Sequence, residues 1–110
     1  MSLWSDYLLE RLGHEVIEVE EGFAQISFVD GICGLENIYV LPLFRKTGVA
    51  GVLLGKVTLR AKELGCTKVA TQVWPSIKGA DAALSAAIKY GFKLISADNR
   101  RILMIKEIGG

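Results

Sequence analysis

The stretch "NIYVLPLFRKTGVAGVLLG", residues 37–55, constrains the fold more than any other part of this 110-residue chain. An apolar run typical of a strand leads into two cations, a threonine and a glycine, and an apolar helical pattern follows. A turn that only reverses the chain does not need this arrangement. A helix N-terminus, however, has unpaired backbone N–H groups and the positive end of the helix dipole, so it attracts phosphate. The stretch therefore predicts an anion-binding turn between a strand and a helix.

Two common phosphate-binding motifs do not account for this turn. The phosphate loop of ATPases has four residues between its glycines, then Lys and Ser or Thr. Here only three residues separate Gly51 from Gly55, and Val57 follows Lys56. The dinucleotide fingerprint G-x-G-x-x-G is also absent. We expect Gly51 and Gly55, four residues apart on one helix face, to allow close packing of the helix against a sheet.

Hydrophobic periodicity predicts the order α-β-β-β-α-β-α-β-β. The three helices are expected at residues 3–12, 49–64 and 79–90. The six strands are expected at residues 15–20, 23–30, 35–41, 68–74, 92–97 and 101–107. A strand, a helix and a second strand at residues 35–74 form a crossover, so these two strands should be parallel and the remaining pairs antiparallel. The fold class is α/β, with a mixed sheet, helices on both of its faces, and a single domain at residues 1–110.

Composition limits the environment and the function classes. Apolar residues make up 51% of the chain, which is compatible with a homodimer interface. Trp4 and Trp74 are candidates to line such an interface. No apolar stretch reaches the roughly 18 residues that a membrane span needs, and no signal peptide is recognisable. Cys33 and Cys66, with one histidine, favour buried thiols in a cytoplasmic protein over a metal site or a disulfide.

Charge divides the chain into two parts. Residues 1–40 contain eight acids and one arginine, whereas residues 41–110 contain twelve Lys and Arg and four acids. One interpretation is solvated faces of opposite sign, and the other is a basic site for an anion beside an acidic site for a cation. Nucleic-acid binding is not expected, because the cations are spread over several elements without interleaved aromatics.

A resemblance to a known family follows from two segments. "VLPLFRKTGVA", residues 40–50, resembles the acyl-CoA loop of the GNAT superfamily of N-acetyltransferases, V-x-P-x-x-[RQ]-x-x-G-x-[GA], at every fixed position. "AAIKYGFK", residues 86–93, resembles the end of the family's fourth helix. The element order also matches over residues 3–107.

The resemblance implies acetyl-CoA as cosubstrate and a set of binding residues. Backbone amides of the loop would hold the pyrophosphate of CoA, with charge from its two cations; the loop residues are Arg45, Lys46, Thr47, Gly48, Val49 and Ala50. The parallel strands would splay, and the backbone of Ile38 and Val40 would bind the pantetheine and the acetyl carbonyl. Arg45 and Lys46 could instead be plain surface cations.

Acetyl transfer from a thioester to an amine requires removal of an ammonium proton. Glu36 is the candidate base, since related enzymes have a glutamate in this strand. Strict alternation places Glu36 on one face with Ile38 and Val40, an apolar setting that would raise its pKa, and places Tyr39 on the other face. The alternative is a rim carboxylate without a catalytic role.

The general acid is where the sequence departs from the family. The usual tyrosine, four residues before the glycine that ends the fourth helix, is replaced by Ala87. Tyr90 is the catalytic candidate in its place, although packing is its simpler role, and Tyr39 is an alternative. The family's first strand and helix also have no counterpart, so the acceptor site should be open or completed by a partner chain.

The sequence therefore predicts a small, N-terminally shortened N-acetyltransferase that acts on a primary amine of a small molecule or protein, with a cationic acceptor favoured. The alternative is a catalytically degenerate module of the same fold that binds CoA or serves in protein assembly.

Overall fold

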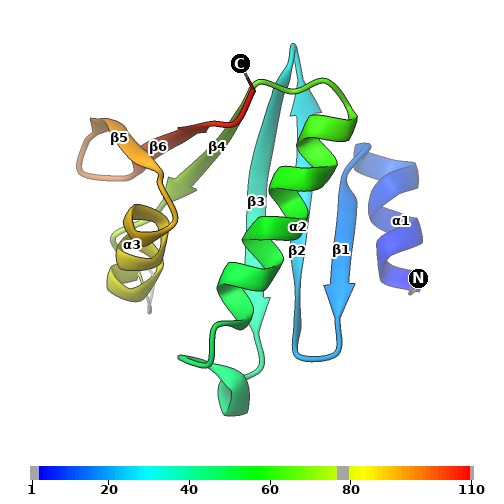
Figure 1. Ribbon diagram of the computed structural model, residues 1–110, viewed down its shortest axis with the longest axis horizontal. Coiled ribbons are helices and arrows are strands. Elements are labelled where there is room, and N and C mark those ends of the chain that lie inside the picture. Colours follow the sequence, from blue (N-terminus) through cyan, green and yellow to red (C-terminus); the bar gives the residue numbers. More distant parts are fainter. Residues whose placement is uncertain (1–2, 77–79, 110) are drawn as a thin grey trace.

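A computed structural model describes residues 3–76 and 80–109. These residues form three α-helices and six strands in the predicted order, with one short 3-10 turn, and Figure 1 shows their arrangement. The helices are α1 (Leu3–Leu12), α2 (Val49–Glu63) and α3 (Ala80–Lys89), and the turn is η1 (Pro42–Phe44). The strands are β1 (Glu15–Val19), β2 (Gly22–Val29), β3 (Ile32–Val40), β4 (Lys68–Val73), β5 (Lys93–Ala97) and β6 (Ile102–Glu107).

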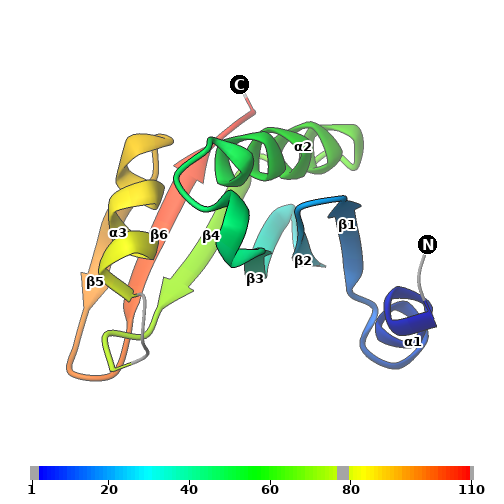
Figure 2. The ribbon, with the colours of Figure 1, turned by 90° about the horizontal axis from the view of Figure 1, so that it is seen from below.

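The strands form one mixed sheet in the order β1-β2-β3-β4-β6-β5. β3 and β4 are parallel and joined through α2, while the other neighbouring strands are antiparallel. This confirms the predicted crossover. Figure 2 shows α2 and α1 on opposite sides of the β1–β3 part of the sheet, as expected for helices on both faces.

The core lies between the sheet and the helices α2 and α3. Its fully buried side chains include Ile26 of β2, Leu53 and Val57 of α2, and Met104 of β6. Cys33 and Cys66 are buried free thiols, as predicted. On the other side of the sheet, α1 packs by Trp4, whose ring meets Phe23 edge-on at 4.8 Å between centroids.

Glycines end two of the helices. Gly65 (φ 78°) follows α2 and Gly91 (φ 94°) follows α3, both in the left-handed conformation. The N–H of Cys66 donates to the Ala61 carbonyl, and the N–H of Phe92 donates to the Ala87 carbonyl, each at 2.9 Å. These are the bonds of a Schellman cap, which satisfies carbonyls that a helix end leaves free. They fix where each following strand begins.

Some details differ from the sequence-based expectations. β3 begins at Ile32, three residues earlier than predicted, because it continues the hairpin with β2. Gly79, the predicted first residue of α3, lies outside the described residues. The expected packing of two glycines against the sheet is wrong. A Cβ on Gly55 would meet nothing within 4 Å, while one on Gly51 would meet Tyr90 instead of a strand. Among the described residues, no helix is long and apolar enough to cross a membrane.

Candidate active site

The loop before α2 leaves the start of that helix without a side-chain cap. Gly48, the N-cap residue, has φ 92° and makes no side-chain hydrogen bond. The first N–H of α2 with a backbone partner is that of Val52, which donates to the Gly48 carbonyl at 3.1 Å. Within the described part of the chain, the N–H groups of Val49, Ala50 and Gly51 have no partner. Three donors at the positive end of the helix dipole therefore point out of the helix, an arrangement that suits an anion.

The polar side chains of the loop do not fill this position. Arg45 donates from Nε to the Val40 carbonyl at 3.0 Å, and its guanidinium carbon lies 5.7 Å from the centre of the Tyr39 ring. Thr47 donates its hydroxyl to the Phe44 carbonyl. Lys46 is exposed and has φ 66°, which is rare for a residue other than glycine. Arg45 is thus tied to the end of β3 by its Nε, and within the described chain its terminal nitrogens make no hydrogen bond or ion pair.

The two parallel strands separate beside this loop. Their pairing runs from Ile32 with Lys68 to Leu35 with Thr71 and then stops, although β3 continues to Val40. The N–H of Leu41 donates to the Glu21 carbonyl beside β2 at 2.8 Å. Because successive backbone groups in a strand point to alternate edges, the N–H groups of Val40 and Ile38 face the β4 side. No described strand pairs with β3 there.

Glu36 lies at a β-bulge that the sequence analysis missed. The register pairs Leu35 with Ile26 and Asn37 with Gln25, so no β2 residue opposes Glu36. A bulge inserts one extra residue and breaks the alternation of faces. The expectation that Glu36 shares an apolar face with Ile38 and Val40 is therefore wrong.

The observed surroundings of Glu36 are polar. Its side chain is exposed and accepts a hydrogen bond from the Ser27 hydroxyl at 2.8 Å. Gly34 leaves room for this bond, because a Cβ there would lie 2.6 Å from Ser27 Oγ. Ser27 and Phe23 alternate onto one face of β2, and Tyr39 pairs with Phe23. Tyr39 consequently lies on the same face as Glu36, contrary to the expectation from strict alternation.

Glu36 borders a groove of about 200 Å³ where β3 and β4 separate. The groove is lined by Gly34, Leu35, Glu36, Ala70, Thr71, Gln72, Trp74 and Leu103. Trp74 follows the end of β4 and remains 43% exposed. The groove thus combines a carboxylate with an aromatic ring at an open edge.

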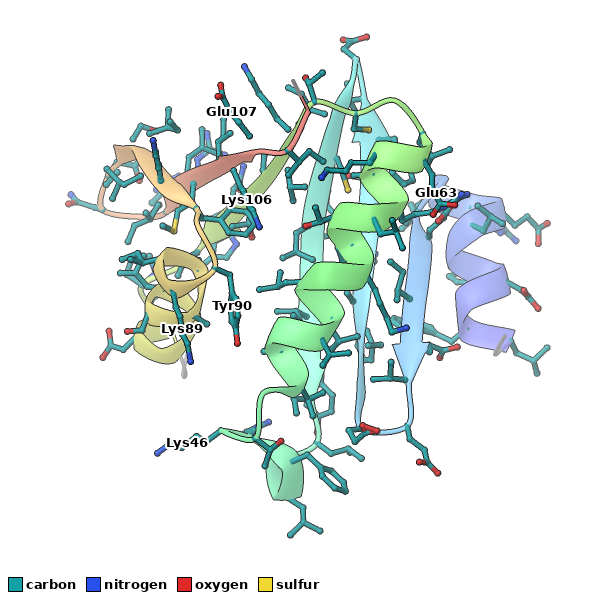
Figure 3. The ribbon with its side chains drawn as sticks, in the orientation of Figure 1. Lys46, Glu63, Lys89, Tyr90, Lys106 and Glu107 are labelled. Atoms are coloured by element: carbon teal, nitrogen blue, oxygen red, sulfur yellow. The ribbon has the colours of Figure 1, made fainter. Side chains whose placement is uncertain are left out.

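Tyr90 and Ala87 lie on the α2 side of the sheet. Ala87 is 7% exposed and belongs to the hydrophobic core. Tyr90 is half-buried, and Figure 3 shows its side chain extending from the end of α3 towards α2. Its role as the general acid stays a prediction.

Sequence reasoning missed several polar partners. Gln25 is buried and links the residue before β1 to β3, since its amide nitrogen bonds His14 Nδ1 at 2.8 Å and its amide oxygen accepts from Asn37 at 3.0 Å. His14 therefore has a structural role in holding Gln25. The apolar pair Leu35 and Ile38, three residues apart, was the available signal for the bulge.

No group of three or more His, Cys, Asp or Glu among the described residues is arranged to hold a metal ion.

Comparison with known proteins places these features in a family. The model of the acetyltransferase (GNAT) family matches residues 17–92, which include β3, the loop, α2 and α3. The chain belongs to this family.

The chain is also similar to individual proteins, and the similarity covers between about half and most of each protein's length. It is 33% identical over 88 residues to an aminoglycoside N(6')-acetyltransferase type 1 from Acinetobacter haemolyticus, covering 76% of this chain and 54% of that protein. The chain therefore spans about half the length of this curated relative.

Two solved structures share the fold. The structure of a putative GNAT-family acetyltransferase from Desulfovibrio desulfuricans has a TM-score of 0.80 at 18% identity, covering 94% of this chain and 75% of that one. A GNAT-family acetyltransferase from Elizabethkingia anophelis, solved with acetyl-CoA bound, has a TM-score of 0.72 at 21% identity, covering 96% and 85%. These likenesses agree with the predicted mixed α/β fold and its order of elements.

Proposed function

We propose that this chain is an N-acetyltransferase domain that uses acetyl-CoA to acetylate a primary amine. The observation that carries the proposal is the uncapped start of α2 beside the free edge of β3. An anion held by Val49, Ala50 and Gly51 would place the rest of an extended ligand along the gap between β3 and β4. The relative from Elizabethkingia anophelis, which shares the fold, was solved with acetyl-CoA bound.

The residues present fit such a ligand. The backbone from Arg45 to Ala50 binds the pyrophosphate, with Lys46 adding positive charge. The free N–H groups of Ile38 and Val40 bind the pantetheine and the acetyl carbonyl, and that of Val40 polarises the carbonyl by donating a hydrogen bond. Acetyl-CoA supplies the activated acetyl thioester.

Glu36 accepts the proton of the attacking amine, directly or through one water, from its place in the groove. Ser27 orients the carboxylate by its hydrogen bond. A second hollow, of about 380 Å³, is lined by Glu20, Glu21 and Phe44. A cationic acceptor would suit these two glutamates. The aminoglycoside acetyltransferase relative is consistent with an amine acceptor.

Isothermal titration with acetyl-CoA tests the anion site. Gly48→Glu puts a carboxylate where the phosphate would bind, and a Cβ at Gly48 meets nothing within 4 Å. The matched control is Gly13→Glu. Gly13 has φ 70° and equally open surroundings, but it lies in a different turn, between α1 and β1. We expect binding by the wild type and the control, and at least about tenfold weaker binding by Gly48→Glu, because a charge repulsion replaces a favourable contact. Equal affinities in all three proteins would refute the site.

Thiol release with a panel of amines tests turnover. Glu36→Gln preserves the shape of the side chain and removes its basicity. We expect a fall in kcat/KM of about a hundredfold or more, the usual contribution of a general base. Unchanged turnover of this variant across pH 6 to 9 would remove Glu36 from the mechanism.

One observation favours the alternative of a non-catalytic module. Ala87, at the position of the family's usual tyrosine, is buried in the core and cannot act as an acid. Binding of acetyl-CoA by the wild type without thiol release from any amine would support this alternative. The single domain, the cytoplasmic location and the homodimer remain predictions from the sequence.

A further inference from the structure

Tyr90 and Gly51 form a contact that joins α3 to the first turn of α2. A Cβ on Gly51 would lie 2.7 Å from Cζ of Tyr90 and closer still to its hydroxyl oxygen. The phenol therefore occupies the space that a side chain at residue 51 would need. Gly51 is the third residue of α2, and Tyr90 is the residue between α3 and the left-handed Gly91. The Schellman cap at Gly91 fixes the backbone from which Tyr90 projects.

The hydroxyl of Tyr90 thus lies beside the turn that carries the free N–H groups of α2. It makes no hydrogen bond to any described residue, although a phenol can donate one. Lys89 adds positive charge, with Nζ 5.7 Å from the centre of the Tyr90 ring. In Figure 3, Tyr90 points from α3 towards α2, and Lys46 extends from the loop before α2. The Tyr90 hydroxyl and the free backbone donors of α2 therefore lie close together, and Lys89 adds positive charge beside the Tyr90 ring.

We propose that Tyr90 is a cofactor-binding residue, whose hydroxyl donates a hydrogen bond to the phosphate group held by the first turn of α2. This inference rests on the proposed function and deepens it. Tyr90 then acts at the phosphate end of the ligand, whereas a general acid would act at the acyl end, near Val40. The glycine at residue 51 is required because any larger residue would displace the phenol.

The test compares Tyr90→Phe with the wild type, using acetyl-CoA and acetyl-pantetheine, which lacks the phosphates. Phenylalanine keeps the ring and its packing and removes only the hydroxyl. The matched control is Tyr7→Phe, since Tyr7 lies on α1 and is 56% exposed. Titration gives the affinity for acetyl-CoA, and thiol release gives kcat and KM for both donors with one amine.

We expect Tyr90→Phe to bind acetyl-CoA about tenfold more weakly, the usual effect of losing a hydrogen bond to a charged group. KM for acetyl-CoA should rise while kcat and its pH profile stay unchanged, and acetyl-pantetheine should not distinguish the variant from the wild type. Tyr7→Phe should match the wild type throughout.

Other outcomes overturn the inference in distinguishable ways. A wild-type affinity in Tyr90→Phe would refute the phosphate contact alone and leave the proposed function intact. A fall in kcat with an altered pH profile and an unchanged affinity would show that Tyr90 is the general acid. A wild type that does not bind acetyl-CoA would refute the proposed function together with this inference.

Discussion

At the scale of single residues, two glycines on one helix differ in what surrounds them. Gly55 is exposed and has open space around its missing Cβ, whereas Gly51 faces the Tyr90 ring. Gly55→Ala should raise the free energy of unfolding by about 0.5–1 kcal/mol, because alanine favours helix more than glycine does. Gly51→Ala should be less stable than Gly55→Ala, since the same gain is offset by displacement of Tyr90. Chemical denaturation of the two variants measures the difference.

Tyr90→Ala and its two double variants, with Gly51→Ala and with Gly55→Ala, isolate the contact. In a Tyr90→Ala background, Gly51→Ala and Gly55→Ala should stabilise the chain by similar amounts, because the phenol is no longer present. If Gly51→Ala were as stabilising as Gly55→Ala in the wild-type background, the Tyr90 ring would not occupy the space beside Gly51. This double-mutant cycle measures only the pairwise term.

Some features of single residues can be predicted from the local sequence, whereas others depend on which residue of a neighbouring strand lies opposite. Gly48 could be identified as a turn residue from the sequence, because it stands directly before an apolar helical pattern. Its φ is positive, a conformation that glycine adopts readily. Glu36 stays a predicted general base, and its face was not predictable from strict alternation. A bulge depends on how β2 and β3 align, and local sequence carries only the Leu35 and Ile38 spacing as evidence.

At the scale of elements, the turn between β5 and β6 is held by one carboxylate. Asp98 accepts hydrogen bonds from the backbone N–H groups of Arg100 and Arg101 at 2.7 and 2.9 Å. These bonds lower the pKa of Asp98 below its ordinary value. A carboxyl group whose folded pKa is lowered stabilises the fold above its unfolded pKa of about 3.9, and this stabilisation is lost as pH falls through the folded pKa.

Asp98→Asn tests this turn, because the amide oxygen can accept the same bonds without the charge. We expect the wild type to melt at a higher temperature than Asp98→Asn at pH 7, and the difference to shrink as the pH falls below about 4. Thermal melts of both proteins at pH 7, 4 and 2.5 measure it. A difference that stays constant over this range would mean that the charge of Asp98 does not stabilise the turn.

Elements were the most predictable part of this fold. In the described chain, both ends of every helix and strand lie within three residues of their expected positions. The reason is that glycines mark several of the ends, and the period of the apolar residues changes between strands and helices. The β3 start was the largest shift. Its first residues look like part of a turn, since Gly31 and Gly34 surround Ile32 and Cys33, and only the pairing with β2 makes them a strand.

At the scale of the whole molecule, the sheet joins two parts that meet at β3 and β4. The crossover rule predicted this parallel pair, but not where its pairing ends. The pairing ends after Leu35 and Thr71, directly before the bulge at Glu36, and a bulge locally disrupts the ladder, so the end of the pairing could not be placed before the register was known. The candidate site is therefore a property of the assembled sheet, whereas the loop at Gly48 is a property of the local sequence.

Cys33 lies at the centre of this assembly and reports on its global unfolding. It is 0% exposed and belongs to the core cluster that joins both parts. Burial raises the pKa of the Cys33 thiol to about 12, with a further contribution from Cys66. Because this folded pKa exceeds the unfolded value of about 8.5, the neutral thiol stabilises the fold fully below pH 8.5, and the effect is lost as pH rises towards 12.

We therefore expect stability to fall more steeply with pH in the wild type than in Cys33→Ala between pH 9 and 11. The extra slope should reach at most about 1.4 kcal/mol per pH unit, the value for one proton. Cys33→Ala is itself less stable at pH 7, because it leaves a small cavity, so the slopes and not the absolute values are compared. Urea denaturation at each pH provides them. Parallel pH dependences for the two proteins would mean that the Cys33 thiol ionises as readily in the folded chain as in the unfolded one, which a closed core would not allow.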